Sequence, residues 1–237
     1  MNPSQGRRVH DHIRATGARD LLDIGTAHGA SAAYMAAALE SGGPGRVTTV
    51  DRHHFAGPTP EETLTRAGVA NRVRTVRIEH SSYTWWLKEQ VEAHSDADGN
   101  CTPAFDFCYL DGAKDWNIDG LAVVLIEKLL RPGGWLLLDD LDWSYDGSGY
   151  TPVPADLSRA ERAQPHVRAV FEVLVKPNPA FSEFRVEDDW WAWAKKAPGE
   201  PRRLRLETTR GRRHALAERL PPRARALARR LARPFRA

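Results

Sequence analysis

The sequence predicts an α/β fold: a doubly wound, mostly parallel seven-stranded sheet with helices on both faces and a C-terminal antiparallel hairpin. Over residues 19–140, five strand-like segments alternate with helix-like segments, as in right-handed βαβ crossovers between parallel strands. Over residues 181–196, two further strand-like runs flank a turn at Asp188–Asp189. A chain of 237 residues is long enough for one such domain with a substantial core.

Four of the first five strands end at a glycine or a carboxylate, and the third, RVRTVRI, intersperses valine and isoleucine with polar residues. The first run stops at Gly25 and the second ends at Asp51, while the fourth and fifth end at Asp111 and at Asp139–Asp140. Short apolar and β-branched runs bounded by turn residues are typical of buried strands. The predicted strands are residues 19–25, 46–51, 72–78, 104–111 and 132–140.

The helices between these strands are indicated by composition and by their first residues. Residues 29–40 are rich in alanine and are followed by the helix-breaking sequence SGGPG. Thr59 is suited to cap the next helix, with Pro60 at its first position. The predicted helices are residues 29–40, 59–68, 82–94, 118–130 and, before the hairpin, 166–176.

Charge is divided unevenly along the chain. The formal net charge is +3, but residues 201–237 carry 13 arginines and two glutamates, a net of +11, so residues 1–200 carry −8. A linker with proline and glycine separates the two parts, and we therefore expect a domain over 1–197 and an Arg-rich, helical tail over 198–237.

The tail has several candidate partners. Its leucines recur four residues apart, which predicts short basic amphipathic helices broken by a proline pair. Such helices could bind nucleic acid, an anionic membrane surface or an acidic partner. Packing against the acidic body of a neighbouring subunit, or extension into solvent, is slightly favoured over these, so a homo-oligomer is expected.

Other classes of protein are disfavoured by composition. No run approaches the roughly 18 apolar residues of a membrane span, and the N-terminal segment is polar and unlike a signal sequence. The two cysteines, Cys101 and Cys108, are too few for a disulfide framework, and no Cys/His spacing resembles a zinc site. A cytoplasmic protein is expected.

The first strand leads into a candidate ligand-binding loop, because ligands in open α/β sheets bind beyond the carboxyl ends of the strands. The loop reads DIGTAHG, in which Gly25 and Gly29 allow a tight turn and a close approach of the backbone to a ligand. Asp51, at the end of the second strand, is placed to accept hydrogen bonds from both hydroxyls of a ribose. A tight turn without a ligand explains the glycines equally well. Because the spacing is not G-x-G-x-x-G, a nicotinamide dehydrogenase is disfavoured.

Carboxylates also end two strands that are expected to be neighbours. Asp111 follows the fourth strand and Asp139–Asp140 follow the fifth, so all three would meet at one edge of the sheet. Three unpaired carboxylates would repel one another, whereas a bound cation removes the repulsion, and oxygen ligands favour Mg²⁺. The alternative is that these aspartates cap helices or pair with arginines.

The glycine loop and Asp51 together resemble the class I S-adenosylmethionine-dependent methyltransferases, which have a Rossmann-like fold. The resemblance implies that Asp51 holds the ribose of S-adenosylmethionine and that the adenine lies near residues 80–82, where Ser81 is assigned to the cofactor. The remaining cofactor-binding residues that it implies are Asp23, Gly25, Thr26, Gly29, Ser31 and Asp111.

The stretch YLDGAKDW and the later LLRPGGWLLLDD resemble the metal-dependent O-methyltransferases of the catechol O-methyltransferase type. They are more similar still to the macrocin and antibiotic-sugar O-methyltransferases. This resemblance, over residues 20–197, implies a Mg²⁺ ion on Asp111, Asp139 and Asp140, with Asp111 and Lys114 catalytic and Lys114 as the base. The sugar-modifying relatives have a histidine at the position of Lys114, and a surface ion pair of Lys114 with Asp115 is the alternative role.

The expected function is a Mg²⁺-dependent O-methyltransferase acting on a sugar or another small polyhydroxy acceptor, such as an oligosaccharide or a natural-product glycoside. An RNA ribose methyltransferase or a nucleic-acid-binding protein on the same scaffold is the alternative, and a catechol or phenol O-methyltransferase is a further one. Trp116, Trp143 and Tyr145 follow the fourth and fifth strands and could stack on the acceptor, or equally could form a small local core.

Overall fold

The computed structural model describes residues 1–40, 42–52, 56–79, 81–149, 153–199 and 203–205. Most of the Arg-rich tail lies outside the described residues, so its helices and its partners stay predictions. Residue 80, which the sequence placed near the adenine of the cofactor, also lies outside them.

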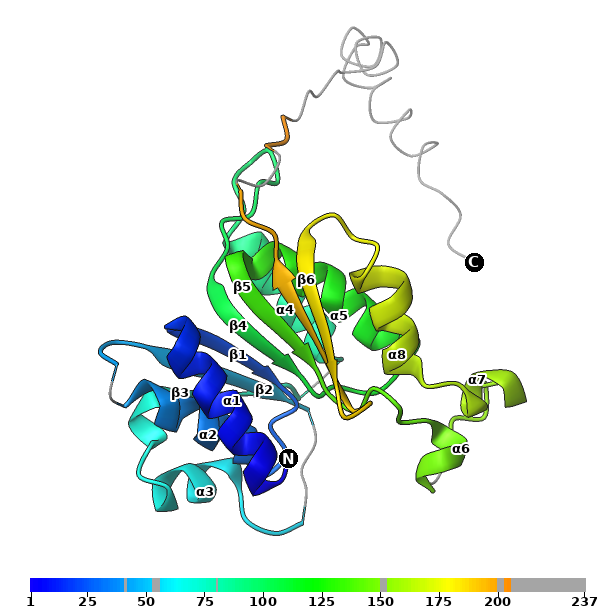
Figure 1. The fold of residues 1–237 in the computed structure, drawn as a ribbon, viewed down its shortest axis with the longest axis horizontal. Helices are drawn as coiled ribbons and strands as arrows, with labels where there is room; N and C mark the ends of the chain where they lie inside the picture. Colours follow the sequence, from blue (N-terminus) through cyan, green and yellow to red (C-terminus); the bar gives the residue numbers. More distant parts are fainter. Residues whose placement is uncertain (41, 53–55, 80, 150–152, 200–202, 206–237) are drawn as a thin grey trace, which may run out of the picture.

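The predicted fold class is confirmed. Seven strands form one sheet in the order β3-β2-β1-β4-β5-β7-β6, in which β1 to β5 pair in parallel and β7 pairs antiparallel with both β5 and β6 (Figure 1). The strands are β1 (Asp20–Ile24), β2 (Arg46–Asp51), β3 (Val73–Arg77), β4 (Phe105–Leu110), β5 (Leu130–Leu138), β6 (Phe181–Glu187) and β7 (Trp191–Lys196).

Helices cover both faces of the sheet and enclose two apolar cores (Figure 1). On one face, α1 (Pro3–Thr16), α2 (Ala30–Leu39) and α3 (Pro60–Arg66) pack over the first core. On the other face, α4 (Tyr83–Ala93), α5 (Trp116–Leu129) and α8 (His166–Val170), which continues as a π-helix over Phe171–Val175, pack over the second. The remaining elements are a 3-10 turn (Ala70–Arg72) and two short helices after β5, α6 (Tyr145–Ser148) and α7 (Arg159–Ala163).

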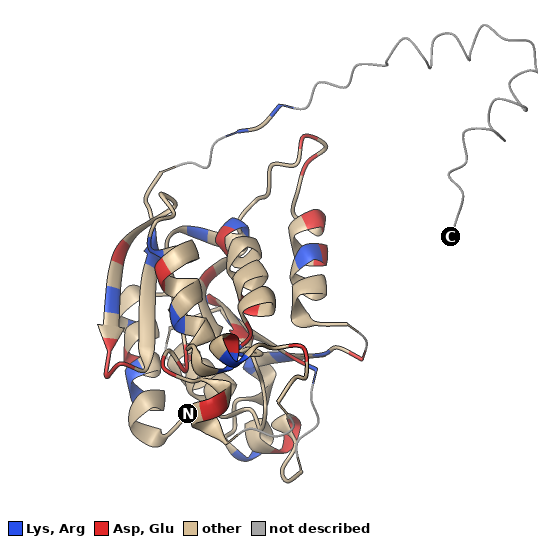
Figure 2. Ribbon diagram, turned by 90° about the vertical axis from the view of Figure 1, so that its right-hand side faces the viewer, with Lys and Arg blue, Asp and Glu red and all other residues tan. Residues whose placement is uncertain are grey.

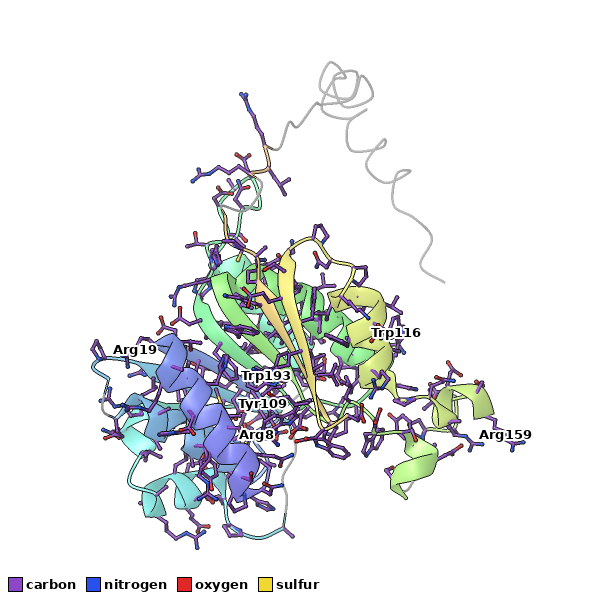
Figure 3. The ribbon with its side chains drawn as sticks, viewed as in Figure 1. Arg8, Arg19, Tyr109, Trp116, Arg159 and Trp193 are labelled. Atoms are coloured by element: carbon purple, nitrogen blue, oxygen red, sulfur yellow. The ribbon has the colours of Figure 1, made fainter. Side chains whose placement is uncertain are left out.

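Helix α1 was not predicted, because its residues are mostly polar. Its start is fixed by a capping box, in which the Asn2 side chain accepts from the backbone of residue 5 and the Gln5 side chain accepts from the backbone N–H of Asn2. Its end is fixed by Gly17 in a left-handed conformation. Only a narrow apolar stripe of the helix, with Val9 and Ile13, is buried. It packs in the same core as Tyr109 and Trp193, which are labelled in Figure 3.

The hairpin turn at Asp188–Asp189 is confirmed. Both residues have positive φ, 55° and 52°, as a type I′ turn between antiparallel strands requires. The turn brings β7 back beside β5 and buries Trp191 and Trp193. The hairpin therefore extends the sheet on the β5 side, with β7 between β5 and β6.

No helix among the described residues is long and apolar enough to cross a membrane. Acidic and basic residues are interspersed over the described part of the chain (Figure 2).

Candidate active site

The strand order changes direction between β1 and β4, since the chain adds β2 and β3 on one side and β4 and β5 on the other. Such a switch point leaves a crevice at the carboxyl ends of the strands. A cavity of about 230 Å³ lies there. Its lining residues are Gly25, Ala27, Asp51, Arg52, Ser82, Tyr83, Asp111, Gly112, Ala113, Lys114 and Ile118.

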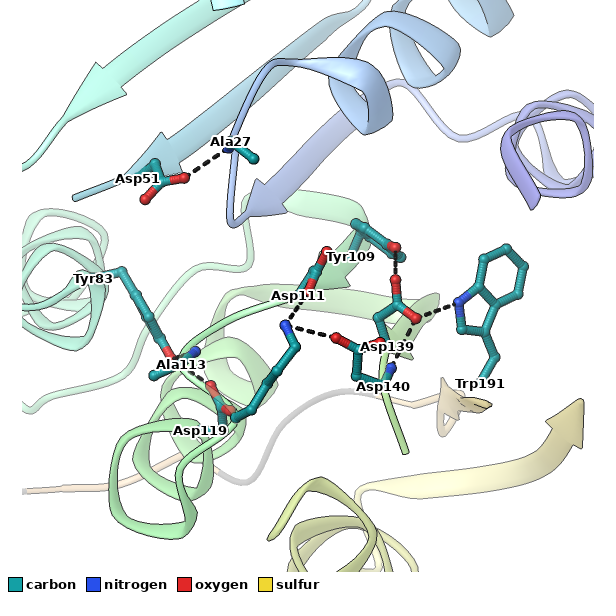
Figure 4. A network of polar contacts seen from close by, with 11 residues as sticks. Ala27, Asp51, Tyr83, Tyr109, Asp111, Ala113, Asp119, Asp139, Asp140 and Trp191 are labelled. Atoms are coloured by element: carbon teal, nitrogen blue, oxygen red, sulfur yellow. Dashed lines mark hydrogen bonds and ion pairs between the residues drawn. The ribbon is translucent and has the colours of Figure 1, made fainter. Parts of the chain in front are cut away.

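The loop after β1 forms one wall of this cavity. Gly25 has a φ of +99°, and a Cβ atom built on it would lie 1.9 Å from the carbonyl oxygen of Asp111, so only glycine lets the two strand ends approach this closely. Two residues later, the backbone N–H of Ala27 donates to Asp51 Oδ2 over 2.7 Å (Figure 4). The loop is thereby drawn toward the end of β2, where the ribose-binding carboxylate was predicted.

Three of the residues predicted to bind the cofactor form a buried hydroxyl–carboxylate cluster behind the loop. Asp23 Oδ2 accepts hydrogen bonds from Thr49 Oγ1 at 2.6 Å and from Ser31 Oγ at 3.0 Å, and the hydroxyl of Thr26 bonds to that of Thr49. Within the described residues, Asp23 Oδ1 is buried with no hydrogen-bond partner. Burial raises the pKa of Asp23 to about 7, although both hydroxyl bonds oppose the shift.

This raised pKa gives a test of the cluster. In the folded chain Asp23 binds its proton more tightly than in the unfolded chain, so its contribution to stability is present below about pH 4 and is lost as the pH rises to about 7. Asp23→Asn keeps an oxygen for the two hydroxyls but cannot ionise. We expect the melting temperature of Asp23→Asn to exceed that of the wild type at pH 8 and to approach it at pH 4. An equal difference at the two pH values would contradict the shift.

Tyr83 also lines the cavity and forms a buried pair with Asp119 that was not predicted from the sequence. The Tyr83 hydroxyl donates to Asp119 Oδ1 and accepts from the N–H of Ala113 at 2.9 Å (Figure 4). A Cβ atom on Gly112 would lie 2.4 Å from both Tyr83 Oη and Asp119 Oδ1. Burial raises the pKa of Asp119 to about 6, while the hydrogen bond from Tyr83 opposes the shift. The pair therefore holds the loop after β4 in place.

Of the residues predicted to lie near the adenine, Ser82 lines the cavity, whereas the exposed Ser81 is not among its lining residues. Adenine binding there stays a prediction. Gly29 has a φ of +84°, caps the start of α2 and is not among the residues that line the cavity.

A lysine lies between the ends of β4 and β5. Lys114 Nζ is 2.6 Å from Asp111 Oδ1 and 2.7 Å from Asp140 Oδ2. Burial alone would lower the pKa of Lys114, but the two carboxylates outweigh it and raise the pKa above its ordinary value. Asp115, the other partner considered for this lysine, instead caps α5 by accepting from the N–H groups of residues 117 and 118. In this arrangement Lys114 is a cation and not a free base.

Asp139 lies at the same edge but bonds elsewhere. Its Oδ1 accepts from Trp191 Nε1 at 2.7 Å and from the backbone N–H of Asp140 at 2.8 Å, and its Oδ2 accepts from the hydroxyl of Tyr109 (Figure 4). Burial, followed by the charge of Asp111, raises the pKa of Asp139 to about 6. The three predicted carboxylates are thus brought together, but only two of them contact Lys114. No group of three or more Asp, Glu, His or Cys side chains in the described part of the chain is arranged to hold a metal ion.

Of the aromatic residues predicted to contact an acceptor, Trp143 and Tyr145 lie at or just before the start of α6, and Trp116 is the first residue of α5. The rings of Trp143 and Tyr145 meet edge to face with centroids 4.8 Å apart, and Tyr145 is buried 5.5 Å from the ring of His166. His166 Nδ1 accepts from the backbone N–H of Trp116 at 3.2 Å. Tyr145 thus packs in a local core, the second of the two roles considered for it, whereas Trp116 and Trp143 are half-buried.

Part of the chain resembles a known protein family. Residues 22–141, from β1 to just beyond β5, match a family described as a methyltransferase domain. No curated protein sequence matches the chain significantly.

Solved structures share the fold. An O-methyltransferase from Bacillus cereus in complex with SAH is 24% identical with a TM-score of 0.60, over 83% of this chain and 82% of that one. The O-methyltransferase TomG from Streptomyces achromogenes, in complex with SAM, is 21% identical with a TM-score of 0.58, over 83% and 81%. The SAH-bound methyltransferase PaMTH1 from Podospora anserina is 18% identical with a TM-score of 0.60, over 83% and 79%. At these identities the likeness extends to the fold alone.

Proposed function

The chain belongs to the family of methyltransferase domains, and from that premise we propose that it is an S-adenosylmethionine-dependent O-methyltransferase of a small hydroxyl acceptor. The observation that carries the proposal is the switch-point cavity, which has a ribose-type carboxylate, Asp51, in one wall and the cation-bridged pair Asp111 and Asp140 beside the other.

Electrostatics favour this cofactor. S-adenosylmethionine carries a sulfonium and an ammonium group, and three carboxylates, Asp23, Asp51 and Asp111, stand at or behind the cavity. The unpartnered Oδ1 of Asp23 suits a cationic group, because a buried carboxylate oxygen without a hydrogen bond is costly. The solved relatives from B. cereus and S. achromogenes bind SAH and SAM, which supports the same cofactor here.

The donor set supports a magnesium ion with two protein carboxylates. Asp111 and Asp140 converge on one cationic group with hard oxygen donors, and Mg²⁺ is often held by one or two carboxylates, with substrate and water completing its shell. Asp139 is better suited to support the site, since its oxygens accept from Tyr109 and Trp191 and it bonds the backbone of Asp140. We therefore assign Asp111 and Asp140 as ligands and Asp139 as their support. When bound, the ion would lower the pKa of a coordinated hydroxyl and fix its orientation.

The protein's own residues would perform the rest of the reaction. Methyl transfer from a sulfonium is an in-line displacement, so the acceptor oxygen must lie opposite the S–CH₃ bond. Asp51 and the Gly25 loop would fix the donor, while Tyr83 and Asp119 hold the loop that carries Lys114. Lys114 can accept the hydroxyl proton only after it leaves its two carboxylates, because they hold its proton in place.

An acceptor with two vicinal oxygens fits this site best, since such a pair can chelate the ion. A sugar diol is the leading acceptor, on the resemblance of the strand-end motifs to the antibiotic-sugar enzymes, and a catechol has the same oxygen geometry.

Removal of the ribose carboxylate tests the cofactor assignment. Asp51→Ala deletes an acceptor of charge-assisted hydrogen bonds worth about 1.5–3 kcal/mol, so we expect the Kd for S-adenosylmethionine to rise about 10- to 150-fold by isothermal titration calorimetry. Glu172→Ala removes an exposed acid that pairs with Lys176 far from the cavity, and it should leave this Kd unchanged. Equal affinity of Asp51→Ala and the wild type would refute the assignment, as would a failure of the purified protein to bind the cofactor at all.

A further inference from the structure

We propose that Lys114 is a tethered cation that neutralises the Asp111–Asp140 pair when no metal is bound, and that a divalent ion must displace it to bind. The inference rests on the metal assignment proposed above and adds a competition within the same site. It predicts that the chain lowers its own affinity for the ion while remaining folded without it.

Lys114 makes the close, largely buried contacts of a residue in a binding site, unlike a lysine on the protein surface. Its ammonium lies within 2.7 Å of an oxygen of each carboxylate, and its side chain is only 20% exposed. Asp111 and Asp140 are 27% and 16% exposed at the side chain, so neither has full access to water as an alternative partner. The ammonium therefore takes up the hard-oxygen contacts that a metal ion would use.

Two residues of this contact, Lys114 and Asp140, have an unusual backbone conformation. Lys114 has a φ of 57° and Asp140 a φ of 58°, in the left-handed region, which aspartate tolerates but lysine rarely adopts. Such conformations persist only where the surrounding structure imposes them. For Lys114 that support comes from the loop before it, where the N–H of Ala113 donates to the hydroxyl of Tyr83. The fold thus fixes the backbone at Lys114. A side-chain rotamer adopted by chance is therefore a poor explanation for its contact with the two carboxylates.

Charge balance explains why the site needs such a group. Asp111, Asp139 and Asp140 lie together; besides burial, the charges of Asp111 and Asp140 raise the pKa of Asp139, and the charge of Asp111 raises the pKa of Asp140. The single positive charge of Lys114 offsets part of this repulsion. A divalent ion that binds the same oxygens removes the need for the lysine, which is then free to turn toward the acceptor.

Binding of the metal alone tests the competition. Lys114→Met keeps an unbranched apolar chain and removes the charge, and we expect it to bind Mg²⁺ and Mn²⁺ at least about tenfold more tightly than the wild type by calorimetry, which corresponds to about 1.4 kcal/mol. Lys114→Arg keeps the charge and should bind no more tightly than the wild type. Lys88→Met removes a lysine that pairs with Glu92 on the exposed face of α4, and its metal affinity should not change.

Thermal unfolding gives a second readout that needs no activity. We expect the melting temperature of Lys114→Met to fall in chelator and to recover in Mg²⁺, whereas that of the wild type changes less between the two conditions.

The wild-type protein gives a third readout, in case the variant does not fold. Added Mg²⁺ should increase the labelling of Lys114 by an amine-reactive reagent, measured by mass spectrometry, with Lys88 as the internal reference.

The outcomes separate the inference from the proposed function. Equal or weaker metal binding by Lys114→Met, or labelling of Lys114 that Mg²⁺ leaves unchanged in a protein that binds the ion, would overturn the competition while the metal assignment stands. Absence of metal binding in the wild type and in Lys114→Met alike would overturn the metal assignment itself, and the inference with it.

Discussion

Asp111→Asn is expected to lower kcat/KM for methyl transfer by about 100- to 1,000-fold. The substitution keeps the shape of the side chain but removes the charge that faces Lys114 in the structure and that would bind the metal in the proposed reaction. Groups aimed at the charge that develops in a transition state are typically worth two to three orders of magnitude in rate. The measurement is steady-state kinetics with saturating cofactor, together with calorimetry of cofactor binding.

The same substitution four residues later provides the control. Asp115 caps α5 through its side-chain oxygen, and asparagine caps helices about as well as aspartate, so Asp115→Asn should retain nearly full activity. If Asp111→Asn were as active as Asp115→Asn, the carboxylate after β4 would have no part in the reaction.

Gly25→Ala is expected to destabilise the chain by several kcal/mol and to abolish cofactor binding. The new methyl group would fall 1.9 Å from the carbonyl oxygen of Asp111, so that the β1 loop and the end of β4 would have to separate. Separation would open the wall that both strands contribute to the cavity. Urea denaturation gives the free energy of unfolding, and calorimetry gives cofactor binding.

A second glycine provides a control that distinguishes the cost of backbone strain from the cost of this steric clash. Gly43 has a φ of +91°, close to the +99° of Gly25, but a Cβ atom on it would meet nothing within 4 Å. Gly43→Ala should therefore cost only the conformational penalty, about 1–2 kcal/mol, and leave the cavity intact. Similar losses of stability in the two variants would mean that the contact of Gly25 with Asp111 does not limit the site.

The sheet could be predicted from the sequence because its local signals agree with the final structure. β1, β4 and β5 are short apolar runs that end at a residue suited to a turn or a site, β2 and β3 are rich in valine and threonine, and the hairpin turns at Asp188–Asp189, where both residues adopt the positive φ that aspartate tolerates. Helix α1 escaped prediction because most of its residues are polar, and its capping box at Asn2 and Gln5 was the signal that could have revealed it.

The location of the site could be predicted from the sequence, but the directions in which its side chains point could not. Adjacent parallel strands end side by side, which is why Asp111 and Asp140 meet at Lys114. The two aspartates after β5 differ because the backbone leaves the extended conformation at Asp140, which has a φ of 58°: Asp139 bonds to Trp191, whereas Asp140 bonds to the lysine. No local sequence pattern marks this change of backbone conformation, so the sequence could not distinguish the two residues as metal ligands.

The Tyr83–Asp119 pair could not be found in the same way. The two residues are 36 positions apart, and each is embedded in a helix pattern with no motif around it. Only the packing of α4 against α5, together with the absence of a side chain on Gly112, brings them together at the cavity.

The most direct test of the account is a crystal structure of the protein grown with S-adenosylhomocysteine and Mn²⁺, with anomalous data to locate the metal. We predict ribose hydroxyls within hydrogen-bonding distance of Asp51, an anomalous peak bound by Asp111 and Asp140, and Lys114 moved away from both. A cofactor bound outside the cavity, or Lys114 still bridging the two carboxylates with no metal between them, would contradict it.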